Sequence, residues 1–99
     1  MRVMLKAQFD VQAANEATKD GSLPAAFQQV MERLQPEAAY FLPQEGKRTC
    51  LMFFDLKDPS QIPVVAEPFF QIAKAAIDIT PAMTVEDLQK GLREAKQAS

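Results

Sequence analysis

The 99-residue chain contains no histidine and only one cysteine, Cys50. Without histidine it lacks the commonest general base, the serine–histidine and cysteine–histidine nucleophile systems, and most zinc, copper and haem ligation schemes. A single cysteine excludes an intramolecular disulfide, which is typical of proteins of the reducing cytoplasm. Any chemistry must therefore use Asp, Glu, Lys, Tyr or Cys side chains, and we expect no metal and no other cofactor.

Long apolar segments and clustered positive charge are also missing. No hydrophobic run approaches the ~20 residues that cross a bilayer, and residues 1–6 lack the apolar core and cleavage site of a signal peptide. The eleven Lys and Arg residues are scattered over a chain of net charge −2. We therefore expect a cytoplasmic protein that has neither nucleic acid nor a membrane as a partner.

The composition is that of an ordinary globular protein, with 47% hydrophobic and 24% charged residues. The length predicts one domain over residues 1–99. Its most apolar run, Thr49 to Leu56, lies between turn-forming residues and is too short for a helix. This run predicts a central strand with both faces covered.

Three further segments have the patterns of strands. Residues 3–9 alternate between apolar and polar with period two. Residues 38–42 are followed by Pro43, which suits an edge strand, and Gly46 allows a hairpin turn back into the central strand. Residues 75–80 predict the fourth strand.

Helices are predicted between these strands. Asp10 is a suitable N-cap for a helix over 11–19, and a break at Gly21 separates it from an amphipathic helix over 24–35. A helix after Asp58 is expected to be short or irregular, because Pro68 forces a kink or an end. Thr84 and Asp87 resemble a capping box that begins a C-terminal helix over 85–99, whose residues from 94 onward are expected to fray.

This order of elements predicts an α+β fold: a ferredoxin-like βαββαβ sandwich with an extra C-terminal helix and a four-stranded antiparallel sheet in the order four-one-three-two. Helices on one face leave the other face bare. A large bare apolar face marks an interface or a ligand groove. The simplest way to cover it is a homodimer that packs sheet against sheet about a twofold axis.

The chain resembles the dimeric α/β-barrel superfamily, which includes stress-responsive barrel proteins, metal-free monooxygenases and muconolactone-isomerase-like proteins. The resemblance covers residues 1–83 by the order and length of the elements. It also rests on the run Glu67-Pro68-Phe69-Phe70 leading into Ile77-Asp78-Ile79-Thr80-Pro81-Ala82-Met83, which is similar to small uncharacterised members. The resemblance implies a homodimer with a cavity between its sheets, but members share a fold rather than a reaction. Many also place a histidine in that cavity, and this chain has none.

The bare face carries a few polar side chains among apolar ones. We expect Asp78, Lys6 and Tyr40 to be the polar groups of a site that binds a small, partly apolar molecule and isomerises or oxidises it without a metal. In the strand order above, Lys6 is a partner for Asp78 or Asp55. The remaining candidates for the lining of the cavity are Met4, Gln8, Leu51, Phe53, Asp55 and Thr80.

Each candidate also has a structural interpretation. Lys6 and an acidic partner suit a plain cross-strand ion pair, and Tyr40 suits an edge strand where its ring packs and its hydroxyl is wet. Cys50 in the central strand is typical of a small buried hydrophobe without reactivity. Glu45, Lys47 and Arg48 are expected to form a solvated hairpin tip. The alternative function is therefore a non-catalytic dimerisation or interaction module whose cavity is filled.

Overall fold

The computed structural model describes residues 1–98, which form four strands and four helices in the order β-α-α-β-β-α-β-α. The strands are β1 (Arg2–Gln8), β2 (Ala38–Gln44), β3 (Lys47–Asp55) and β4 (Ala76–Pro81). The helices are α1 (Val11–Lys19), α2 (Ser22–Leu34), α3 (Gln61–Ala73) and α4 (Val85–Ala98).

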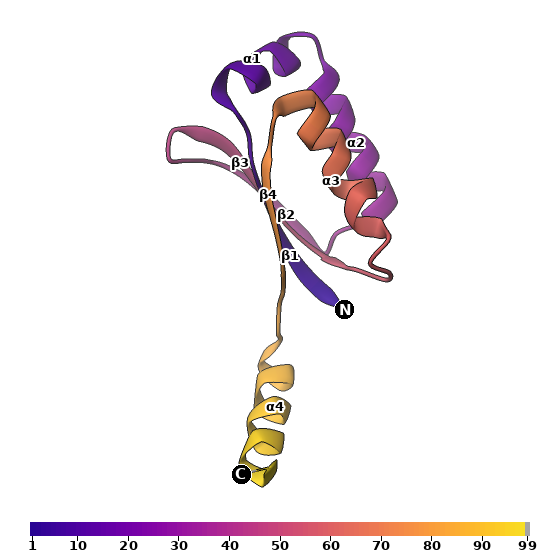
Figure 1. Ribbon diagram of the computed structural model, residues 1–99, viewed down its shortest axis with the longest axis vertical. Helices are drawn as coiled ribbons and strands as arrows, with labels where there is room; N and C mark the ends of the chain where they lie inside the picture. Colours follow the sequence, from indigo (N-terminus) through magenta and orange to yellow (C-terminus); the bar gives the residue numbers. More distant parts are fainter. Residues whose placement is uncertain (99) are drawn as a thin grey trace.

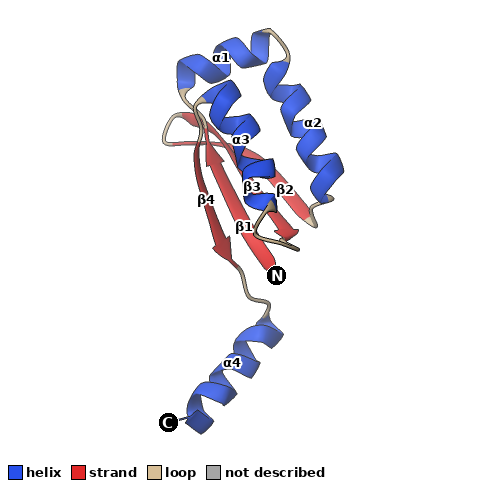
Figure 2. Ribbon diagram, turned by 45° about the vertical axis from the view of Figure 1, so that its right-hand side comes forward, coloured by secondary structure: helices blue, strands red, loops and turns tan. Residues whose placement is uncertain are grey.

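The strands form one antiparallel sheet in the order β2-β3-β1-β4 (Figure 2). The two inner strands are β3 and β1, and β2 with its Pro43 is an edge strand, as predicted. The α+β, ferredoxin-like arrangement and the predicted strand order are therefore confirmed.

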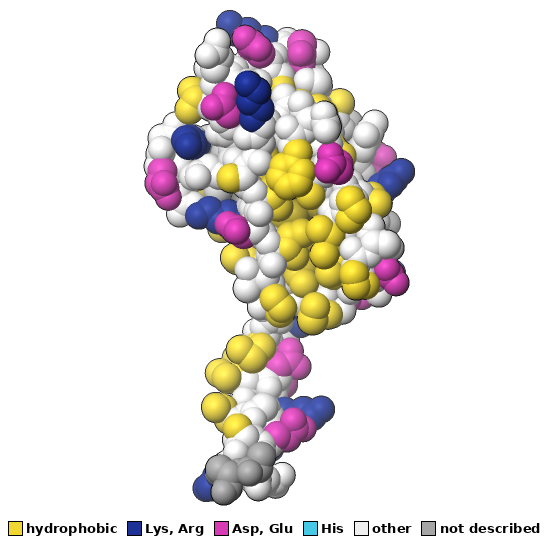
Figure 3. Space-filling model, viewed as in Figure 1, with side chains coloured by type: hydrophobic (Ala, Val, Ile, Leu, Met, Phe, Trp, Pro, Cys, Tyr) yellow, Lys and Arg dark blue, Asp and Glu magenta, His cyan; other side chains and the backbone are white. Residues whose placement is uncertain are grey.

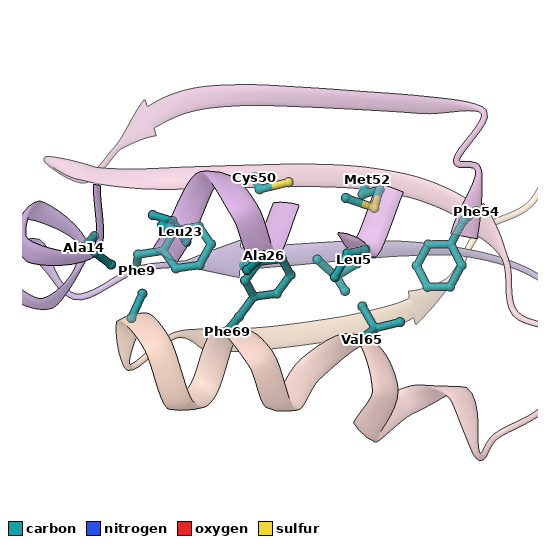
Figure 4. Close-up of a cluster of buried hydrophobic side chains, with 14 of the residues drawn as sticks. Leu5, Phe9, Ala14, Leu23, Ala26, Cys50, Met52, Phe54, Val65 and Phe69 are labelled. Carbon is teal, nitrogen blue, oxygen red and sulfur yellow. The ribbon is translucent and has the colours of Figure 1, made fainter. Parts of the chain in front are cut away.

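Helices α1, α2 and α3 cover one face of the sheet (Figures 1 and 2). Alternate residues of β1 and β3 point into the core beneath them, among them Leu5 and Met52, both with no exposed surface. Figure 4 shows Phe69 of α3 reaching this layer beside Ala26 of α2 and Phe9. The ring of Phe9 lies 5.6 Å from those of Phe27 and Phe69 in edge-on arrangements, which are favoured geometries for aromatic pairs.

Local signals in the sequence set the ends of several elements as expected. The carboxylate of Asp10 accepts a hydrogen bond from the Ala13 amide at 3.0 Å and caps α1. Gly21 has a φ of +83° and separates α1 from α2. Glu45 and Gly46 both have positive φ, 55° and 75°, as in the two-residue turns that join antiparallel strands.

The expectation for the helix after Asp58 was wrong. Helix α3 runs for 13 residues without ending at Pro68. Its buried residues Val65, Phe69 and Ala73 recur every four positions and anchor both halves of the helix in the core, and this burial offsets the roughly 3 kcal/mol cost of an internal proline. Val64 and Pro68 border a surface hollow on the other side of the helix.

Helix α4 projects from the end of the sheet (Figure 1), and the molecule accordingly measures 55 × 28 × 18 Å. It begins with the predicted capping box: the Thr84 amide donates to the Asp87 carboxylate at 3.0 Å, and the Asp87 amide donates to the Thr84 hydroxyl at 3.1 Å. The helix continues through Ala98, and Ser99, the last residue of the predicted helix, lies outside the described residues. Within residues 1–98, no other helix or strand packs along α4.

Candidate functional site

The face of the sheet that α1 to α3 leave uncovered, here called the open face, carries every candidate residue. The register places the following side chains on it: Arg2, Met4, Lys6 and Gln8 of β1; Ala38, Tyr40, Leu42 and Gln44 of β2; Lys47, Thr49, Leu51, Phe53 and Asp55 of β3; and Ala76, Asp78 and Thr80 of β4. Leu51 and Phe53 remain half-exposed there. The expectation that both faces of the central strand are covered is thus wrong for the single chain.

The three polar candidates lie in one row across the sheet. The pairing runs from Tyr40 to Leu51, from Leu51 to Lys6 and from Lys6 to Asp78. Neighbouring strands are about 4.8 Å apart, so the backbones of Lys6 and Asp78 are about 5 Å apart and those of Tyr40 and Lys6 about 10 Å. A ligand of modest size lying across Leu51 would reach all three side chains.

Lys6 and Asp78 are directly opposed, as one of the two predicted pairings requires. Among the described residues, the Lys6 ammonium and the Asp78 carboxylate do not form an ion pair with each other. Asp78 is exposed and Lys6 is half-exposed. Their charges therefore remain solvated in the single chain, and a second layer over the open face would be needed to enclose them.

The next row consists of Ala38, Phe53, Met4 and Thr80. Phe53 and Tyr40 line a shallow hollow of about 280 Å³, which continues over Met83 and Thr84 toward the start of α4. An ion pair between Arg2 and Glu37 stands at its rim. Tyr40 is 60% exposed, so its phenol is available to a ligand or to a partner surface.

Gln8 and Asp55 lie at opposite ends of the open face and have partners of their own. The Gln8 side-chain amide donates to the Gln44 carbonyl at 3.0 Å, which ties β1 to the hairpin. Asp55 lies opposite Arg2, two rows from Lys6. Its carboxylate pairs with the N-terminal ammonium at 2.7 Å, and this hydrogen bond and charge hold the pKa of Asp55 below its ordinary value. Asp78 is therefore the nearer acidic neighbour of Lys6.

Cys50 faces the core and has no exposed surface. Burial raises the pKa of its thiol to about 11. The thiolate is the nucleophilic form of cysteine, so this residue is a poor candidate for chemistry, as the sequence indicated.

A larger cavity lies at the hairpin end of the sheet, away from the row of Tyr40, Lys6 and Asp78, and the sequence reasoning missed it. It has a volume of about 550 Å³ and lies between the β2–β3 hairpin and helices α1 and α2. The hairpin tip is exposed, as predicted. Its Lys47 and Arg48 also line this cavity, and the Arg48 guanidinium donates to the Asn15 side-chain oxygen at 2.6 Å. Two adjacent cations next to apolar strand residues were the available signal.

No group of metal-ligating side chains was found among residues 1–98. Over the same residues, no helix is both long enough and apolar enough to cross a membrane.

Comparison with known proteins assigns no family. The sequence matches no protein-family model, and a search of curated proteins finds no significant match.

Proposed function

We propose that the protein is a homodimer of the dimeric α/β-barrel type, in which two open faces pack across a twofold axis and enclose a small, partly apolar molecule. The observation that carries the proposal is an apolar sheet face without a covering layer, centred on Met4, Leu51 and Phe53. Apolar surfaces of this extent in a small protein belong to interfaces or ligand sites. A second copy brings an identical surface, as a twofold interface requires.

Helix α4 supports the same assembly. Val85, Leu88 and Leu92, here called the apolar flank of α4, are 66%, 45% and 61% exposed. Helices α2 and α3 lie to the right of the sheet in Figure 1, so the open face is directed to the left. Hydrophobic side chains line the left side of the first turns of α4 in Figure 3, and the acidic and basic side chains beside them lie on the right. A partner that covers the open face is thus on the correct side to cover α4.

In the catalytic form of the proposal, the row of polar residues provides the chemistry of a metal-free isomerase or monooxygenase. For an isomerisation, Asp78 would take a proton from one carbon of the ligand and return it to another. Lys6 would hold the developing negative charge, and Tyr40 would donate a hydrogen bond to a ligand carbonyl. Enclosure by the partner would strengthen each of these interactions, because water would be excluded from the cavity.

The alternative is a non-catalytic module in which side chains of the two copies fill the space between the sheets. Leu51 separates Tyr40 from Lys6, and the opposed Lys6 and Asp78 suit a plain cross-strand ion pair. In that case the open face is an interface and nothing more.

The test begins with the mass of the full chain in solution and with native mass spectrometry of protein taken directly from cells. A dimer that carries a small molecule supports the proposal, and a stable monomer overturns the barrel. Asp78→Asn and Lys6→Ala should each reduce the retained molecule at least tenfold, whereas Lys57→Ala, which removes a cation outside the open face, should not. Retention of the molecule by both open-face variants would show that the site is elsewhere. A dimer without any ligand, with its cavity filled in a crystal structure, would favour the alternative.

A further inference from the structure

The 550 Å³ cavity beneath the β2–β3 hairpin has the size of a small-molecule site, because such sites span about 300–1,000 Å³. Residues of α1, of α2 and of the β2–β3 hairpin line it. Its position is independent of the row that contains Tyr40, Lys6 and Asp78, none of which lines it. A ligand here would not depend on the proposed homodimer.

Aromatic and aliphatic side chains form most of the cavity. Phe9 and Leu23, both buried, lie next to each other at this end of the core (Figure 4). The ring of Phe27 stands between those of Phe9 and Phe41, at centroid distances of 5.6 and 5.0 Å. Phe41 is 56% exposed, so a bound ligand could pack against its ring. The remaining apolar lining comes from Val11, Leu42 and Pro43.

The polar side of the cavity is positively charged. Lys47 and Arg48 line it, and none of its described lining residues is acidic. Neither cation forms an ion pair with a carboxylate among residues 1–98. This local excess contrasts with the net charge of −2 for the whole chain. The bond from Arg48 to Asn15 at 2.6 Å uses one guanidinium donor and holds the group at the edge of the cavity, which leaves donors for a bidentate contact with an anion.

We propose that this cavity binds a small carboxylic acid with an aryl or alkyl tail. The tail packs against Phe27 and Phe41, and the carboxylate pairs with Arg48, with Lys47 adding long-range attraction. The apolar lining favours a carboxylate over a sugar phosphate or a nucleotide, because those ligands present hydroxyl groups that an apolar wall leaves without partners.

The test uses 4-phenylbutyrate and its neutral amide, which share a tail and differ in charge. Both are titrated into the isotope-labelled full chain and followed by amide chemical shifts. We expect phenylbutyrate to shift the amides of residues 41–49 and of α1, and to bind at least tenfold more tightly than the amide. Added salt should weaken only the acid, because it screens the charge contact.

Three variants assign the roles. Arg48→Gln should weaken phenylbutyrate at least tenfold and leave the amide almost unchanged, and Lys57→Gln, which removes a cation outside the cavity, should alter neither. Phe41→Ala, at a half-exposed position that folding tolerates, should weaken both ligands. Equal affinities for acid and amide, shifts confined to the strands around Lys6 and Asp78, or an unchanged affinity in Arg48→Gln would each overturn the proposal. A spectrum that does not respond to millimolar phenylbutyrate would overturn it as well.

Discussion

Lys6 of β1 and Asp78 of β4 are directly opposed on the open face of the sheet, one strand spacing apart. They belong to a row of side chains that runs across the sheet from Asp78 through Lys6 and Leu51 to Tyr40. Because the pair lies on the surface that a second copy would cover, the same two residues are relevant to stability, to assembly and to any ligand between the sheets.

Reversing one charge of this pair should destabilise the protein. Lys6→Glu places two carboxylates opposite each other, and we expect the free energy of unfolding to fall by about 1 kcal/mol at low ionic strength. The exchanged pair Lys6→Glu with Asp78→Lys should recover most of the loss. Urea unfolding of the single and exchanged variants measures both effects. Equal stability of the single Lys6→Glu variant and the exchanged variant would show that the two side chains do not interact.

Removing apolar surface from α4 should weaken the proposed dimer. Leu88→Ala with Leu92→Ala keeps good helix formers but removes most of the apolar flank, so the dimer dissociation constant should rise at least about a hundredfold. Glu86→Ala with Gln97→Ala, on the other side of the helix, is the matched control and should change it little. Sedimentation equilibrium gives both constants. An unchanged dissociation constant in the leucine variant would show that α4 contributes nothing and that the two sheets alone form the interface. A monomeric wild-type protein would overturn the dimer itself.

Neighbouring phenylalanines of α3 should differ strongly in their contribution to stability. Phe69 has no exposed surface and packs between Phe9 and Phe27, so Phe69→Ala should lower the free energy of unfolding by about 3–5 kcal/mol. Phe70 is 42% exposed, and Phe70→Ala should cost less than about 1 kcal/mol. Urea unfolding monitored by circular dichroism compares them, and similar losses would contradict the packing of α3 described here.

Cys50 should resist alkylation while the chain is folded. With a thiol pKa of about 11, only about one molecule in ten thousand carries a thiolate at neutral pH. Iodoacetamide should therefore modify the folded protein very slowly and the protein in concentrated guanidinium chloride readily. Intact-mass measurements over time follow both reactions. Rapid modification of the folded chain would mean that β3 opens to solvent.

Acid should weaken the fold through three exposed carboxylates. The pKa values of Asp20, Asp58 and Asp55 are held below the ordinary value by hydrogen bonds from Ser22, from Ser60 and from the N-terminal ammonium, respectively. Since each pKa is lower in the folded than in the unfolded chain, the stabilisation is complete above about pH 5 and is lost as the pH falls through the folded values. The urea midpoint should thus be flat from pH 7 to about 5 and decrease in stronger acid. Asp20→Asn with Asp58→Asn should flatten that decrease, and a rising midpoint in acid would contradict the prediction.

Short-range patterns in the sequence were sufficient for the strands, most helices and their caps. The alternation of β1 decides which side chains share a face, and Asp10, Gly21, Gly46 and the Thr84–Asp87 box act within a few residues of their own backbone. Such signals depend on local geometry, so they can be read without knowing the rest of the fold. The strand order followed from the order of the elements, with helical crossovers on either side of one hairpin.

Relationships between distant residues were decided by the packing of the whole chain. Strand register placed Tyr40 and Asp78 in one row, and the N-terminal ammonium, rather than Lys6, became the partner of Asp55. The buried side of α3 carried the helix through Pro68 in spite of the local cost. The cavity beneath the hairpin is lined by residues of α1, α2 and the two hairpin strands, which are far apart in the sequence. Register, cavities and helix placement all result from contacts between segments far apart in sequence, and no local pattern encodes them.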